Sequence, residues 1–171
     1  MSGLSDAELR RWLQASGSLT AHLRRFGVVE VRVQRQGRMA LWGAEQADLR
    51  QRSGYVREVV LMLNGRAAVW ARSCTSQACS KGPWRALRGL GTRPLAELLF
   101  AQRALRRLPL RTEQLHQGGP VQRHIRRQWQ QLAPNALPAA LPRFARSSVF
   151  WHKDHALRVM EAFSPWVCTL M

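Results

Sequence analysis

The stretch SGYVREVVLMLNGRAAVWARS (residues 53–73) decides the fold, because it has the pattern of two strands folded back on each other. Strand-forming residues flank Asn64-Gly65, the dipeptide that most strongly indicates a two-residue hairpin turn. A regular ladder from that turn places Arg57 directly opposite Arg72 on one face, where like charges repel. Three explanations stay open: the register slips, both side chains are solvated, or an anion lies between the two guanidinium groups.

The rest of the chain predicts further strands and several short helices. Alternating residues predict a strand that begins at residue 29, and ARSSVFWHKDHALRVMEAFSP (145–165) predicts two more, joined by a tight turn near Lys153-Asp154. The clearest helix is predicted within GTRPLAELLFAQRALRRL (91–108). Strands and helices mix without βαβ regularity. The fold class is therefore predicted to be α+β, with a single antiparallel β-sheet flanked by short helices.

The 171 residues suit one domain with a hydrophobic core. Within that domain, residues 109–143 contain Gly118-Gly119, the Gln- and Arg-rich segment QRHIRRQWQQ and three prolines. This composition predicts a basic, partly helical, mobile insert at about 109–143 rather than a second domain.

The net charge of +17 predicts attraction to polyanions or to acidic small molecules. The basic runs Arg103–Arg107 and Arg123–Arg127 are compatible with nucleic-acid contact or with a solvated basic face. Only Trp129 interleaves with them, and the sequence has no recognisable nucleic-acid motif. We therefore expect a solvated face and no nucleic-acid partner.

No apolar run approaches the length of a membrane-spanning helix, and MSGLSDAELRRWLQ has no apolar signal core, so we expect a cytoplasmic protein. The three cysteines are an odd number without a CxxC pair, and the five histidines lack metal-ligand spacing. Reduced thiols and no metal site are the prediction. Cys74 and Cys79 lack an evident histidine–carboxylate setting in the sequence, so nucleophilic catalysis by either is not expected.

Glu161 is a second candidate for chemistry. Strand alternation places it on one face with Leu157, Val159 and Phe163. A carboxylate among apolar neighbours can serve as an acid or a base, or it can be the structural partner of an arginine. The helix start after Thr92 offers backbone N–H groups to an anion, as any helix start does.

Taken in chain order, these motifs resemble the chorismate pyruvate-lyase family, whose members make 4-hydroxybenzoate for ubiquinone. The matching pieces are SLTAHLRRFG (18–27), YVREVVLMLNGRAAVWARS (55–73), LGTRPLAELLF (90–100) and RSSVFWHKDHALRVMEAFSP (146–165). Each piece alone is a weak signal, whereas the ordered set is fairly specific. The resemblance implies a chorismate-lyase-like fold and the cofactor-free conversion of chorismate to 4-hydroxybenzoate and pyruvate.

The resemblance also implies a site. Arg57 and Glu161 match positions that contact the ligand, and we expect both to be catalytic. Arg72 matches an arginine close to the ligand, and the backbone amides of Leu19 and Leu95 match two that bind the product. Expected substrate-binding residues are therefore Leu19, Arg57, Arg72, Leu95 and Glu161, with no metal.

Chorismate is the expected partner, together with peripheral contact to an anionic membrane or to the membrane-bound prenyltransferase, and we expect a monomer. Two other classes of function stay open. One is a non-catalytic small-molecule-binding domain of the same fold, as in the sensors of bacterial transcription regulators, which would not need Glu161. The other is a basic nucleic-acid-binding protein.

Overall fold

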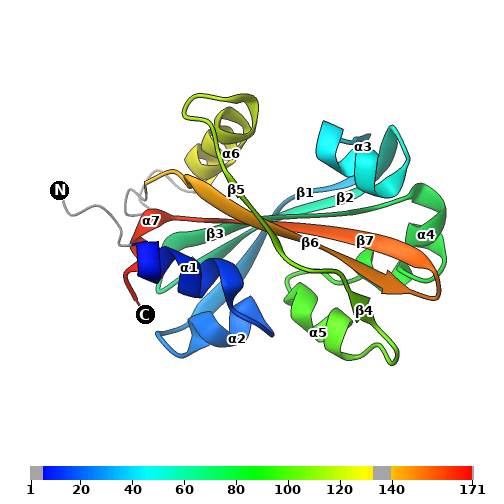
Figure 1. Ribbon diagram of the computed structural model, residues 1–171, viewed down its shortest axis with the longest axis horizontal. Coiled ribbons are helices and arrows are strands. Elements are labelled where there is room, and N and C mark those ends of the chain that lie inside the picture. Colours follow the sequence, from blue (N-terminus) through cyan, green and yellow to red (C-terminus); the bar gives the residue numbers. More distant parts are fainter. Residues whose placement is uncertain (1–5, 133–139, 171) are drawn as a thin grey trace.

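The computed structural model describes residues 6–132 and 140–170, and in these residues seven strands form one antiparallel sheet (Figure 1). The strand order is β1-β2-β3-β7-β6-β4, and β5 also pairs with β6. The strands are β1 (Val29–Ala40), β2 (Ser53–Leu63), β3 (Arg66–Thr75), β4 (Arg106–Arg107), β5 (Arg111–Gln114), β6 (Phe144–His152) and β7 (His155–Phe163).

Short helices cover both faces of the sheet: α1, α2 and α5 lie on one side, and α3 and α6 lie on the other (Figure 1). The helices are α1 (Asp6–Gln14), α2 (Leu19–Arg24), α3 (Gly43–Leu49), α4 (Gln77–Lys81), the 3-10 turn η1 (Arg85–Leu87), α5 (Leu95–Phe100), α6 (Pro120–Gln131) and α7 (Pro165–Cys168). None of the helices in the described ranges is long and apolar enough to cross a membrane. The α+β class with one antiparallel sheet is confirmed.

Both predicted hairpin turns form. Asn64 and Gly65 have φ angles of 51° and 77°, and Lys153 and Asp154 have φ angles of 49° and 62°. Two successive residues with positive φ match the right-handed twist of the flanking strands, which is why Asn, Asp and Gly suit these positions.

The register of the first hairpin differs from the regular ladder. Leu63 pairs with Arg66, as expected, but a β-bulge near Leu61 leaves Ala68 as an extra residue on β3. Beyond the bulge Arg57 faces Ser73, not Arg72. The prediction that Arg57 and Arg72 share a face is therefore wrong. Because side chains alternate, a shift of one residue moves every later side chain of β3 to the other face.

The same bulge removes the charge repulsion, because it places Arg72 opposite Glu58. Arg72 Nη1 donates a hydrogen bond of 2.5 Å to Glu58 Oε1. The slipped register, one of the three explanations open from the sequence, is thus the observed one, and it exchanges a like-charge pair for an ion pair.

Several helices differ from expectation. The helix predicted within residues 91–108 is only α5 (Leu95–Phe100), because Ala104 has a φ of 59° and the chain then joins the sheet as β4. The connection between β1 and β2 contains α3, and the segment that follows β3 contains α4.

The segment 109–143, expected to be a mobile insert, contains β5 and α6 in its described part. Ile125 of α6 is fully buried and belongs to the apolar core on the face of the sheet that α6 covers, together with Trp70 and Met160. Residues 133–139 lie outside the described ranges, and the mobility of the segment stays a prediction.

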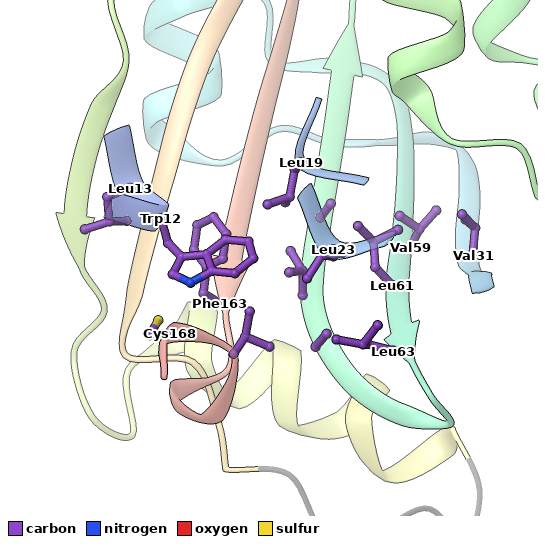
Figure 2. Packing of buried hydrophobic residues seen from close by; sticks show 14 residues of the cluster. Trp12, Leu13, Leu19, Leu23, Val31, Val59, Leu61, Leu63, Phe163 and Cys168 are labelled. Carbon is purple, nitrogen blue, oxygen red and sulfur yellow. The ribbon is translucent and has the colours of Figure 1, made fainter. Parts of the chain in front are cut away.

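On the opposite side, α1 and α2 pack onto the sheet through a second apolar cluster, shown in Figure 2. Trp12 is fully buried against Phe163, with ring centroids 6.1 Å apart. Val59 and Leu61 of β2 belong to the same cluster but also line a cavity. The core on this side therefore continues into the floor of that cavity.

Candidate active site

A cavity of about 470 Å³ lies between the sheet and the helices α2 and α5. Its walls are largely apolar, with a few polar groups, and its volume is of the kind that takes a small organic ligand. Among the described residues, the charged side chains that line it are those of Arg57, Arg107, Arg146 and Glu161. The excess of positive charge favours an anionic ligand.

Arg57 is 2% exposed and extends from β2 toward the loop before α5. Its Nη2 donates to the carbonyl oxygens of Gly91 at 2.8 Å and of Arg93 at 3.0 Å. Its Nε is buried and has no hydrogen-bond acceptor in the described part of the chain. Burial lowers the pKa of Arg57 to about 10, so the side chain is a desolvated cation at neutral pH. Its Nε–H group can therefore donate a hydrogen bond to a ligand.

Glu161 lies on β7 with its carboxylate at the cavity, where Arg146 Nε donates to its Oε2 at 2.5 Å. Both sequence interpretations of Glu161 therefore apply to its position: it lines the cavity, and it is the partner of an arginine. Its side chain is 19% exposed, whereas that of Arg146 is 1% exposed. The carboxylate is thus held in place from behind by a buried cation and remains open toward the cavity.

Arg146 also ties the first helix to this site. Its Nη1 donates to the carbonyl oxygens of Trp12 at 3.0 Å and of Ala15 at 2.8 Å, which come at and after the end of α1. Sequence reasoning did not single out Arg146. A signal was present, because the Lys153-Asp154 turn sets a register in which residue 146 faces Glu161.

Leu19 and Leu95 both line the cavity, and each is the first residue of a short helix, α2 and α5 respectively. Backbone N–H groups in a first helical turn have no partner within the helix. Ser18 caps α2 by accepting from Ala21 N at 3.1 Å. α5 begins after Pro94, two residues later than the start expected after Thr92, and it has no side-chain cap.

Arg72 is absent from the cavity and lies on the opposite face of the sheet, with 2% exposure. Its Nε and Nη2 donate to the two oxygens of Glu45 at 2.6 and 2.9 Å, and its Nη1 donates to Glu58. Burial lowers the pKa of Arg72, but the hydrogen bonds and charges of the two glutamates outweigh burial and raise it. The expected contact of Arg72 with a ligand in this cavity is therefore not supported, because the bulge turned the side chain away.

Arg107 lines the cavity from β4. Sequence reasoning placed it in a helix and counted it with the solvated basic run Arg103–Arg107. The strand pairing that brings it here joins segments more than forty residues apart, since Arg107 pairs with Phe150. No local pattern could have indicated this contact.

The cysteines lie away from the cavity. Cys79 Sγ is 3.2 Å from His155 Nδ1, beside a separate surface groove. All three cysteines are free, and burial raises the pKa of Cys168 to about 11. Among the residues that the structure describes, no group of three His, Cys, Asp or Glu side chains is placed to hold a metal ion.

The chain is similar in sequence to known proteins over nearly its whole length. The family model described as "Chorismate lyase" matches residues 3–168. A protein of Albidiferax ferrireducens named "Probable chorismate pyruvate-lyase" is 43% identical over 166 residues, covering 92% of this chain and 83% of the relative. A protein of Azoarcus sp. with the same name is 40% identical over 172 residues, covering 97% and 88%.

Among solved structures, the effector domain of PhnF from Mycobacterium smegmatis superposes with a TM-score of 0.52 at 13% sequence identity, covering 86% of this chain and 88% of that domain. The longer PhnF structure gives a TM-score of 0.55, also at 13% identity, and covers 88% of this chain and 64% of that one. Likeness at this level of identity concerns the fold alone.

Proposed function

The chain belongs to the chorismate lyase family, and from that premise we propose that it is a chorismate pyruvate-lyase, which converts chorismate to 4-hydroxybenzoate and pyruvate. The observation that carries the proposal is that Arg57 and Glu161, far apart in the sequence, line one cavity with an excess of arginine. We propose ubiquinone biosynthesis as the destination of the product.

The reaction suits such a cavity. Chorismate carries two carboxylates, one on the ring and one on the enolpyruvyl ether. A proton leaves the ring carbon that bears the hydroxyl group, its electron pair enters the ring, and the neighbouring C–O bond breaks with its electrons on the enolpyruvate oxygen. Aromatisation drives the step, and the enolpyruvate then takes up a proton to become pyruvate. The protein must orient a dianion, stabilise negative charge on the departing oxygen and manage one proton.

We assign these tasks to residues of the cavity. Arg57 binds anionic oxygen and stabilises the departing enolpyruvate, in keeping with its buried Nε that lacks an acceptor in the described ranges. Glu161 accepts the proton or positions the ring hydroxyl, and Arg146 holds its carboxylate. The backbone N–H groups of Leu19 and Leu95 bind the remaining anionic oxygens. Arg72 is left out of the substrate-binding set.

The test is to incubate the purified protein with chorismate and to measure 4-hydroxybenzoate by chromatography and pyruvate by a coupled dehydrogenase assay. The expected result is equal amounts of both products. Arg57→Ala should lower kcat/KM by about 2.7–4 kcal/mol of transition-state stabilisation, as for the loss of an oxyanion donor. Arg38→Ala, an exposed arginine on β1, is the control. A folded protein that forms neither product would refute the proposal.

The remaining expectations about partners stay proposals. The charge of +17 and the 68% exposed Phe100 at the cavity edge support contact with an anionic membrane surface near the prenyltransferase. Co-sedimentation with phosphatidylglycerol vesicles, absent with phosphatidylcholine and lost at high salt, is the expected result. The cytoplasmic location and the monomeric state also stay predictions.

The two competing classes make different predictions. A non-catalytic sensor domain would bind chorismate or its product without turnover. A nucleic-acid-binding protein would be retained on DNA with a steep dependence on salt, so turnover without such retention would exclude it.

A further inference from the structure

Because Arg72 does not line the cavity, Arg57 is the one arginine assigned so far to binding the dianionic substrate. We propose that Arg107 is a substrate-binding residue, and that it binds the carboxylate of chorismate that Arg57 does not bind. This inference rests on the proposed function and adds a residue to it.

The two arginines of β4 point in opposite directions. β4 contains only two residues, and strand alternation turns their side chains to opposite faces. Arg106 is exposed, and its guanidinium carbon lies 5.9 Å from the ring centroid of Trp151. Arg107 faces the cavity, and its guanidinium carbon lies 5.1 Å from the ring centroid of Phe150, which also lines the cavity.

Arg107 also has a hydrogen-bond donor that no described residue uses. Arg146 is neutralised by Glu161 and donates to two carbonyl groups. By contrast, Arg107 Nε is buried without an acceptor anywhere in residues 6–132 and 140–170. A buried N–H group without a partner is costly, and a carboxylate that receives it would remove that cost.

Electrostatics act in the same direction. Burial lowers the pKa of Arg107, the nearby charge of Arg146 lowers it further, and Glu161 only partly opposes these effects. Arg107 is thus a cation held beside a second cation, and an incoming anion would stabilise it.

Arg57 and Arg107 lie on either side of Glu161 in the strand order of the sheet. Arg57 lies on β2 and Arg107 on β4, with β3, β7 and β6 between them in the strand order. Glu161, on β7, lies between the two cations. A ligand with two separated carboxylates and a reacting carbon between them matches this order of charges.

The experiment compares Arg107→Gln, Arg107→Lys and the matched control Arg106→Gln, which changes the same charge on the same strand but on the other face. We expect Arg107→Gln to raise KM for chorismate at least tenfold, Arg107→Lys to recover part of that loss, and Arg106→Gln to change KM less than twofold. Thermal unfolding of each variant checks that the fold is kept. Lysine keeps the charge but not the planar fork, so partial recovery is specific to anion binding.

Affinity for 4-hydroxybenzoate, measured by calorimetry, identifies the carboxylate involved. If this affinity falls with Arg107→Gln, the residue binds the ring carboxylate. If it stays while KM for chorismate rises, the residue binds the enolpyruvyl carboxylate. Either result supports the inference. An active wild type in which folded Arg107→Gln has the KM of Arg106→Gln would overturn the inference alone, whereas an inactive wild type would overturn the proposed function.

Discussion

Replacing Arg72 by glutamine should damage the fold and spare substrate binding. In the folded protein the guanidinium group is shared by Glu45 and Glu58, whose side chains are 1% and 0% exposed. Without Arg72, Glu58 keeps donors from His124 and Gln128, whereas Glu45 keeps the backbone N–H of Trp42 and the neutral thiol of Cys74 among the described residues. At least one buried carboxylate is then left poorly compensated.

Breaking a buried ion pair by removing one partner costs about 3–5 kcal/mol, against a total stability of about 5–15 kcal/mol for an ordinary domain. With a urea m-value of about 2 kcal/mol/M, the midpoint of unfolding should fall by about 2 M. Urea titrations followed by tryptophan fluorescence measure this shift. Arg38→Gln, which removes an exposed arginine from β1, should shift the midpoint little.

Adding Glu45→Gln to Arg72→Gln should restore part of the stability, because it removes the uncompensated carboxylate. In buffer without urea, KM for chorismate should stay within a few-fold of the wild type. If Arg72→Gln unfolds at the same urea concentration as Arg38→Gln and instead raises KM strongly, the assignment of Arg72 to the opposite face is refuted.

Burial raises the pKa of Glu58, but its hydrogen bonds and charged neighbours outweigh burial and hold the pKa at about 2, below its ordinary 4.5. The free energy of unfolding should therefore fall as the pH drops from 4.5 to 2. In acid titrations, Glu58→Gln should flatten this dependence on pH. Arg146→Gln should lower kcat more than tenfold because Glu161 loses its positioning partner, with partial recovery in Arg146→Lys; unchanged steady-state kinetics would contradict this role. In the native protein a disulfide reagent should label Cys79 rapidly and the two buried cysteines only after unfolding, which a count of one and then three reacted thiols would establish.

Local features of the sequence determined much of this protein. The Asn64-Gly65 and Lys153-Asp154 turns formed as predicted, since positive φ at two successive residues is a property of those residues and their immediate neighbours. Strand alternation likewise placed Arg57 correctly relative to Val59, and Glu161 relative to Val159, because the side chains of one strand alternate whatever that strand pairs with.

Tertiary structure alone decided which side chains from different strands share a face of the sheet. The bulge at Ala68 shifts β3 by one residue, and its electrostatic consequence depends on Glu58 across the strand pair and on Glu45 in α3. Arg107 lines the cavity because β4 pairs with the edge of β6. Register and pairing follow from contacts between distant segments, whose free energies depend on the assembled sheet and cannot be read from either segment alone.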